Sequence, residues 1–148
     1  MEFEPETDGV FVTSRLLPFP RLDVFAAFKD GTQLAKWWGP DGFRNTFEIF
    51  EFKAHGRWKF VMHGPDGKDY LNENTFLEAT PSQIVIQHLS RPHFTLTITL
   101  TEQGGHTLLD WHQALEDLQF AANLRHIIEP ANEQNLNRLH EVLAGQKP

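Results

Sequence analysis

The chain has 148 residues, 40% of them hydrophobic, and its 13 Lys and Arg against 20 Asp and Glu give a formal net charge of −7. That length suits one domain with one core, and the negative charge disfavours nucleic acid and anionic membranes as partners. The sequence contains no cysteine, which excludes disulfides, thiol nucleophiles and thiolate metal sites.

The first segment, Met1 to Gly9, carries four acidic residues, and we interpret it as a flexible arm. Residues 10–148 are then expected to form a single domain. The acidic start does not match an export signal, and no apolar run reaches the roughly 18 to 20 residues of a membrane-spanning helix. We therefore expect a cytoplasmic protein without membrane contact.

One strand and two short helices are predicted next. The β-branched and aromatic residues of Val10–Leu17 are typical of a strand. A helix over Arg21–Lys29 follows, and the cap residue Asp30 begins a second helix that stops at Gly39-Pro40. Three-residue spacing predicts one apolar face on the first of these helices, made of Leu22, Phe25 and Phe28.

The middle of the chain is a series of strands separated by turn residues, which predicts an antiparallel meander. Leu96, Ile98 and Leu100 alternate with threonines, so the sheet should have one apolar face. A phase slip between Ile49 and Phe50 indicates a bulge. The predicted strands are Phe43–Phe52, Gly56–His63, Asp69–Ala79, Ser82–Ser90, His93–Thr101 and His106–Glu116.

After Glu116 the apolar spacing changes to that of a helix. Pro130 either opens the last helix or bends a longer one, and we favour a separate helix from about Pro130 to Leu143. The element order predicts an α+β fold: a curved antiparallel sheet of about seven strands, with two short helices and a long C-terminal helix packed across it. A curved sheet seldom fills completely around one helix, so a ligand could occupy the gap.

Four segments carry a resemblance to a known family: VFAAFKDGTQLAKWWGP, GRWKFVMHGPDGKDY, FLEATPSQIVI and NLNRLHEVL. From Val10 onward the chain resembles the homologues of the activator of heat-shock protein 90 ATPase, within the START-like (SRPBCC, birch-pollen-allergen-like) helix-grip superfamily. The resemblance implies a cavity between sheet and last helix, used in the superfamily for lipids, sterols, polyketides and other apolar molecules. The chain departs from the family pattern at His55, where a second glycine is frequent, and near Ile128–Pro130, where an aromatic residue is frequent.

The adjacent pair Trp37 and Trp38 raises its own question. Neighbouring helical residues point about 100° apart, so both indoles cannot face one strip of core. We expect one to anchor the helix to the sheet and the other to lie near the cavity; alternatively, both only plug the end of the sheet.

The predicted function is therefore binding of an apolar or aromatic, lipid-like small molecule, with no catalytic residue, cofactor or metal site. Large inward side chains would form the walls, and Tyr70, Asn72 and His88 would recognise polar groups of the ligand. The predicted ligand-binding residues are Trp37, Trp38, Trp58, Phe60, Met62, Tyr70, Asn72, Phe76, His88, Phe94, Leu96, Trp111, Phe120 and Leu124.

Other interpretations stay open. The aromatic residues could fill the core completely, and the chain could be a chaperone-associated, stress-response module or a polyketide-cyclase-like enzyme. Asp110 and His112 are on the strand face opposite Trp111, where water is the simpler surrounding, while His106 and His112 are about 20 Å apart and cannot share a metal ion. A homodimer through a strand edge is also an open alternative.

Overall fold

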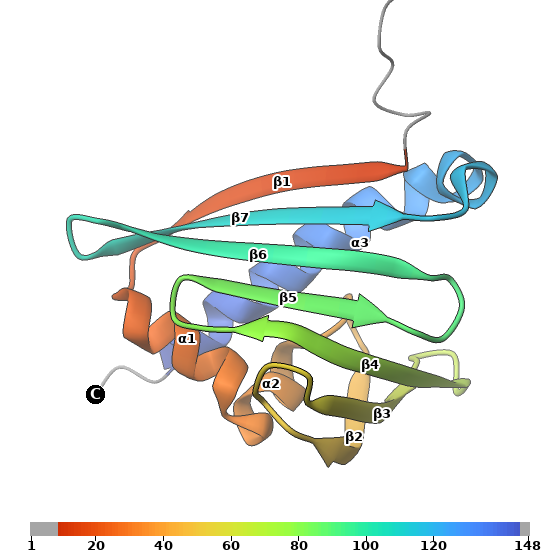
Figure 1. Ribbon diagram of the computed structural model, residues 1–148, viewed down its shortest axis with the longest axis horizontal. Helices are drawn as coiled ribbons and strands as arrows, with labels where there is room; N and C mark the ends of the chain where they lie inside the picture. Colours follow the sequence, from red (N-terminus) through yellow and green to blue (C-terminus); the bar gives the residue numbers. More distant parts are fainter. Residues whose placement is uncertain (1–8, 146–148) are drawn as a thin grey trace, which may run out of the picture.

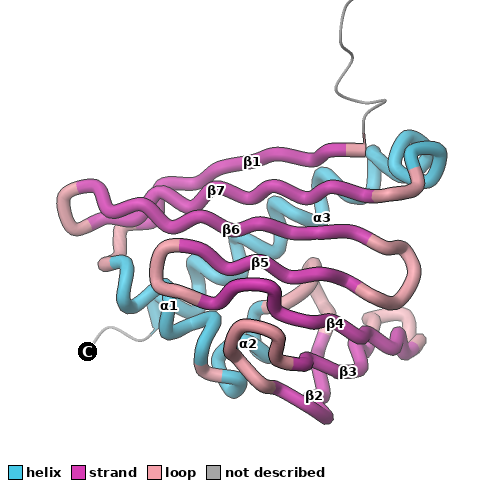
Figure 2. The backbone as a smooth tube through the Cα atoms, viewed as in Figure 1, coloured by secondary structure: helices cyan, strands magenta, loops and turns pink. Residues whose placement is uncertain are grey.

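The computed structural model describes residues 9–145; apart from Gly9, the predicted arm lies outside the described residues. Seven strands form one antiparallel sheet in the order β1-β7-β6-β5-β4-β3-β2 (Figures 1 and 2), which confirms the predicted α+β helix-grip architecture. The strands are β1 (Val10–Leu17), β2 (Arg44–Phe50), β3 (Arg57–His63), β4 (Asp69–Ala79), β5 (Gln83–His88), β6 (Phe94–Gln103) and β7 (His106–Leu115). The helices are α1 (Arg21–Lys29), α2 (Gly31–Trp37) and α3 (Leu118–Gly145).

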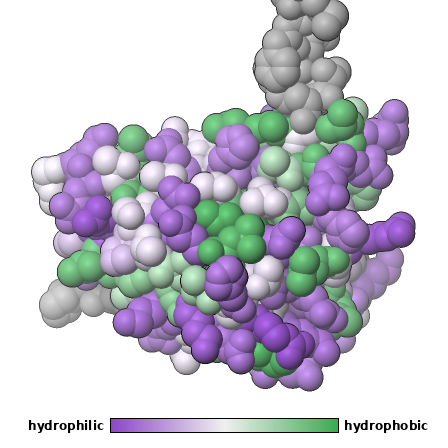
Figure 3. Space-filling view, in the orientation of Figure 1, coloured by the Kyte–Doolittle hydropathy of each residue, from purple (hydrophilic) through white to green (hydrophobic). Residues whose placement is uncertain are grey.

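The sheet has one buried face, because its strands alternate apolar and polar side chains. Leu96, Ile98 and Leu100 of β6 are buried, as predicted. Helix α3 crosses this face diagonally (Figure 1), and the opposite face is mostly hydrophilic with separate hydrophobic patches (Figure 3). The apolar side chains of the sheet are therefore gathered under α3.

Two β-bulges interrupt the pairing of neighbouring strands, one between β2 and β3 and one between β4 and β5. The register of β2 against β3 shifts between Phe47 and Ile49, earlier than the predicted slip between Ile49 and Phe50. A second shift, between Phe76 and Glu78 of β4, was not predicted. Bulges increase the local twist of a sheet and bend the bulged strand, so both fit the curvature at this end.

The short helices lie where the sequence predicts them. The Asp30 carboxylate accepts the backbone N–H of Thr32 at 2.9 Å, which confirms the predicted cap of α2. The predicted apolar face of α1 is wrong at Leu22, whose side chain is 65% exposed. The buried face has the i, i+3, i+4 spacing of a real helical stripe and consists of Val24, Ala27 and Phe28.

The C-terminal helix is longer than predicted. Helix α3 runs without a break from Leu118 to Gly145 with Pro130 inside, so the separate helix beginning at Pro130 is wrong. Proline removes one backbone hydrogen bond, but packing on both sides of it holds the helix: Ala121 is buried before it, and Leu136 and Leu139 after it. Within residues 9–145, no helix combines the length and apolarity that crossing a bilayer requires.

Candidate functional site: a cavity under the C-terminal helix

A cavity of about 620 Å³ lies between the buried face of the sheet, helix α3 and the loop that follows α2. Its residues come from strands β3 to β7, from α3, from the Trp38–Phe43 loop and from the loop between β5 and β6. Apolar and aromatic side chains predominate, and polar groups stand among them. The walls are formed by Trp38, Gly39, Pro40, Phe43, Met62, Asp69, Tyr70, Leu71, Asn72, Asn74, Ile86, His88, Arg91, Pro92, Phe94, Leu96, Trp111, Gln113, Ile128, Asn132 and Asn135.

The two adjacent tryptophans divide their roles at this cavity. Trp37 is fully buried in the core and donates its indole N–H to the carbonyl oxygen of Ala27 at 3.0 Å, a hydrogen bond that ties α2 to α1. Trp38 lines the cavity. Its ring centroid lies 5.5 Å from that of Trp37, 5.1 Å from Trp58 and 5.9 Å from Trp111. All four tryptophans of the chain therefore form one cluster beside the cavity.

The loop after Trp38 is held against α3 by one arginine. The Arg138 guanidinium donates to five carbonyl oxygens, of Lys36 (2.8 Å), Trp38 (3.3 Å), Gly39 (2.9 Å), Pro40 (2.8 Å) and Phe43 (2.9 Å). Gly39 has a φ of 99°, which favours glycine, and its N–H donates to the buried side-chain oxygen of Asn135 at 3.1 Å. We call these contacts the Arg138 clasp. It fixes the cavity wall formed by Trp38 to Phe43.

His88 forms the polar end of the cavity. Its Nδ1 lies 2.8 Å from the carbonyl oxygen of Pro92, which can only accept, so Nδ1 carries the hydrogen. The Nε2 atom lies 2.8 Å from the side-chain oxygen of Asn72 and 3.3 Å from the hydroxyl of Ser90, which can donate to it. Burial lowers the pKa of His88 below its ordinary value of 6.5, and the ring stacks on Phe94 with centroids 4.4 Å apart. At neutral pH the imidazole is an uncharged, firmly held part of the wall.

Comparison with known proteins shows the family of the chain. Residues 18–144 match the model of the family described as Activator of Hsp90 ATPase homolog 1-like protein. The chain belongs to this family. None of the curated proteins matches the chain significantly in sequence.

Solved structures agree with this family's fold. A protein from Nitrosomonas europaea is 18% identical, with a TM-score of 0.85 over 97% of this chain and 98% of that one. A protein from Arthrobacter aurescens is 19% identical, with a TM-score of 0.86 over 97% and 90%. The AHSA1 protein from Silicibacter pomeroyi is 22% identical, with a TM-score of 0.75 over 93% and 99%. At these identities the likeness concerns the fold alone.

The structure brings eight of the predicted ligand-binding residues of this family member to the cavity wall: Trp38, Met62, Tyr70, Asn72, His88, Phe94, Leu96 and Trp111. It does not bring the other six there. Trp37, Trp58, Phe60 and Phe76 are buried in the packed core. Phe120 packs in a smaller cluster with Phe11, Leu115 and Ala121, and Leu124 is half-buried on the same helix.

Several wall residues were missed by sequence reasoning. Gln113 could have been found, because it is two residues from Trp111 and shares its strand face. Phe43, Arg91 and Pro92 come from loops, whose course follows no periodic pattern. Asn132 and Asn135 lie on α3 after Pro130, and the register of that helix against the sheet depends on tertiary packing.

Asp110, His112 and His63 lie on the outer face of the sheet, away from the cavity. Asp110 and His112 lie on the face opposite Trp111, as predicted, with His112 exposed. On that same outer face, His63 bridges Thr46 (2.7 Å to Nε2) and Asp69 (2.8 Å to Nδ1), linking β2, β3 and β4. In the described part of the chain, no group of three or more His, Asp or Glu side chains could hold a metal ion.

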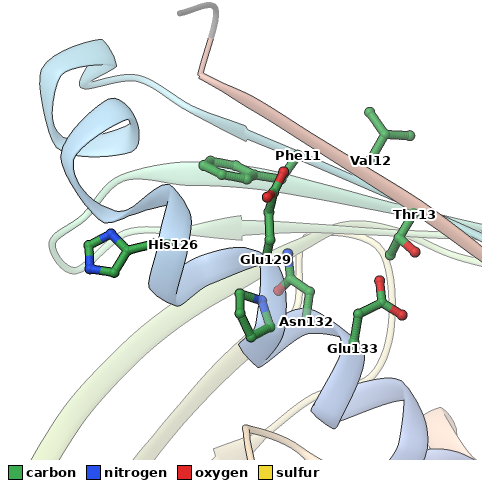
Figure 4. Close-up of a pocket in the computed structure, with 8 residues that line it drawn as sticks. Phe11, Val12, Thr13, His126, Glu129, Asn132 and Glu133 are labelled. Atoms are coloured by element: carbon green, nitrogen blue, oxygen red, sulfur yellow. The ribbon is translucent and has the colours of Figure 1, made fainter. Parts of the chain in front are cut away.

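A second hollow, of about 480 Å³, lies between β1 and α3 (Figure 4). Its carboxylates are already engaged: Glu129 pairs with Arg125 at 2.7 Å and Glu133 with Arg15 at 2.8 Å. A third, of about 710 Å³, is lined mostly by exposed residues of the loops at the ends of β5 and β7. The cavity under α3 combines buried apolar walls with a few polar groups, the usual character of a small-molecule site.

Proposed function

We propose that this chain binds an apolar or aromatic small molecule in the cavity under α3. The observation that carries the proposal is the cavity itself: about 620 Å³ between sheet and helix, with Trp38, Phe94 and Trp111 on its walls. Drug-sized ligands generally occupy pockets of roughly 300 to 1,000 Å³ with mainly apolar linings. Aromatic walls favour flat or ring-containing ligands, because large rings supply much contact area in fixed orientations.

The ligand would enter past Tyr70 and Leu71. Both residues line the cavity, and their side chains are 43% and 56% exposed, so they mark its border with solvent. Ile86 and Leu96 are buried side chains at the opposite limit, on the sheet. The ligand would therefore lie on β5 and β6 with Trp38 and the Arg138 clasp beside it.

The test is a titration with N-phenyl-1-naphthylamine, an uncharged aromatic probe that fluoresces strongly in apolar surroundings. We expect saturable binding of one probe per chain to the wild-type protein. Ile86→Phe replaces a wall side chain with a larger, aromatic one that occupies part of the cavity. It should weaken binding by at least about tenfold, equivalent to about 1.4 kcal/mol. Leu77→Phe is the matched control, because Leu77 is an exposed residue of β4 that does not line the cavity.

Equal binding by wild-type protein and Ile86→Phe, with circular dichroism showing that both are folded, would contradict the proposal. The family also includes domains of the Hsp90-ATPase-activator kind. Stimulation of a purified Hsp90 ATPase, at equal strength in wild-type protein and Ile86→Phe, together with no probe binding, would favour that alternative.

A further inference from the structure

Two asparagines of the cavity wall each have one amide atom without a hydrogen-bond partner in the described part of the chain. Asn74 is on β4 and Asn135 is on α3, and both side chains are only 6% exposed. Polar groups buried to this degree are nearly always paired, because an unsatisfied group costs free energy. The two amides therefore point to a partner that is not part of residues 9–145.

The amide of Asn135 presents a donor. Its Oδ1 accepts the backbone N–H of Gly39 at 3.1 Å, which fixes the orientation of the amide, because an N–H can only donate. Its Nδ2 has no acceptor within residues 9–145, and protein atoms do not enclose it completely, as they do the indole nitrogen of Trp111. Asn135 lines the cavity and is otherwise buried, so a ligand in the cavity can reach this N–H group.

The amide of Asn74 presents an acceptor. Its Nδ2 donates to the carbonyl oxygen of Trp58 at 3.2 Å, which fixes the orientation in the same way, because a carbonyl can only accept. Its Oδ1 receives no hydrogen bond from the described residues and is not completely enclosed by protein atoms. A donor on a ligand can therefore reach this oxygen from the cavity.

The remaining amides of the wall carry less information. Asn72 has protein atoms within hydrogen-bond distance of both of its amide atoms. Asn132 and Gln113 bond to each other at 3.0 Å, and both are half-buried, so water can serve their other amide atoms. Deep burial and an unused, accessible amide atom occur together only at Asn74 and Asn135 among these five wall amides.

The free donor and the free acceptor are fixed by residues that lie close together. Gly39, the partner of Asn135, directly follows Trp38 in the chain. The ring centroid of Trp38 lies 5.1 Å from that of Trp58, the partner of Asn74. An aromatic ligand beside Trp38 would thus have a donor on the α3 side and an acceptor on the sheet side.

We propose that the cavity prefers apolar or aromatic ligands that carry a hydroxyl group, which accepts from Asn135 Nδ2 and donates to Asn74 Oδ1. The inference rests on the proposed function and specifies the ligand class. A hydroxyl is a small group that donates and accepts at once. A ketone or carboxylate oxygen can only accept and an ammonium group can only donate, so each of them would leave one of the two amide atoms unpaired.

A matched pair of probes tests the inference. 2-Naphthol and 2-methylnaphthalene have nearly the same size and differ in carrying OH or CH₃. Their dissociation constants are measured by displacement of N-phenyl-1-naphthylamine. Asn135→Leu and Asn74→Leu should each shift the ratio of the two constants by about 3- to 10-fold against the naphthol, the size of one net hydrogen bond. Asn123→Leu, the matched control at an exposed position of α3 outside the cavity wall, should keep the wild-type ratio.

A second pair of probes separates the donor from the acceptor. 2-Methoxynaphthalene and 2-ethylnaphthalene differ in one ether oxygen, which can only accept. Their ratio should shift against the ether in Asn135→Leu and stay at the wild-type value in Asn74→Leu. A shift of the naphthol ratio in only one of the two variants would contradict a hydroxyl group held from both sides.

A third measurement covers the case in which the variants do not fold. In ¹H–¹⁵N spectra of the wild-type protein, the assigned side-chain amide signals of Asn135 should move downfield with 2-naphthol and not with 2-methylnaphthalene. If N-phenyl-1-naphthylamine binds but 2-naphthol does not, or if neither the ratio nor these signals depend on the hydroxyl, the inference is overturned and the proposed function stands. If neither the naphthalenes nor N-phenyl-1-naphthylamine binds, both fall.

Discussion

Arg138→Met tests whether the clasp holds the cavity wall in place. Methionine keeps much of the side-chain volume and removes every donor to the five carbonyl oxygens of Lys36, Trp38, Gly39, Pro40 and Phe43. Hydrogen bonds to charged groups contribute about 1.5 to 3 kcal/mol each in favourable cases, and those sharing one group are not additive. Burial lowers the pKa of Arg138 while Asp41 and Glu141 raise it, so desolvation offsets part of the gain.

We therefore expect Arg138→Met to lower the free energy of unfolding by about 2 to 4 kcal/mol. For a chain of this size that corresponds to a fall in Tm of roughly 4 to 16 °C. Urea unfolding followed by circular dichroism gives the free energy, and the N-phenyl-1-naphthylamine titration gives the effect on the cavity. Binding should weaken as well, since Trp38 and Phe43 are wall residues on the released loop.

Two further variants make the result specific. Arg138→Lys keeps the charge, but its single ammonium cannot reach carbonyl groups spread over Lys36 to Phe43, so we expect it to lose more than half of the effect. Arg57→Met, at an exposed position of β3, should change stability by less than about 0.5 kcal/mol. A loss at Arg138→Met no larger than that at Arg57→Met would refute the account of the clasp.

The pKa of His88 and the backbone just before β3, at His55 and Gly56, give further predictions. Folding keeps His88 neutral where the unfolded chain takes up a proton, so its contribution to stability is complete above about pH 6.5 and is lost as the pH falls toward the lowered folded pKa. Urea unfolding at pH 7.5 and 5.5 should show a smaller acid loss in His88→Gln than in wild-type protein, with exposed His112→Gln as control; an equal loss would contradict this. His55 has a φ of 67°, so His55→Gly should raise stability by up to about 1 kcal/mol, and thermal unfolding showing a lower Tm would oppose the strain argument. Gly56→Ala should destabilise by more than about 3 kcal/mol, because its Cβ would lie 1.9 Å from the carbonyl oxygen of Glu51; a Tm near that of the wild type would exclude such a clash.

The strands could be predicted from the sequence because only one face of the sheet is buried, so apolar residues recur at every second position of a strand. Leu96, Ile98 and Leu100 with their intervening threonines are an example, and β1 from Val10 to Leu17 is another. The family pattern also indicated one backbone conformation correctly. His55, where a glycine is frequent in the family, occupies the left-handed region that glycine prefers.

Other features depend on contacts between distant segments, and no local pattern records these. Pro130 was expected to begin a helix, but packing of residues on both sides carries α3 through it. The face of α1 was misassigned at Leu22, since a nine-residue helix offers too few turns to separate two apolar stripes. Arg138 is an ordinary charged residue in the sequence. Its role appears only when the Trp38–Phe43 loop folds back onto α3, nearly 100 residues away along the chain.

Some expectations stay predictions. A homodimer would use β1 or β2, which are the end strands of the sheet. The cytoplasmic location and the stress-response role are equally untested by the fold. A cyclase-like reaction would have to use a titratable wall residue such as His88, Tyr70 or Asp69, because Asp110 and His112 face away from the cavity.

The most direct test of the central claim is a crystal structure of the protein with bound N-phenyl-1-naphthylamine. We predict electron density for the probe between the sheet and α3, in contact with Trp38 and Leu96, with the Arg138 clasp intact. Side chains that close the space under α3, with the probe found only on the outer surface or in the loop hollow near Phe120, would contradict the account.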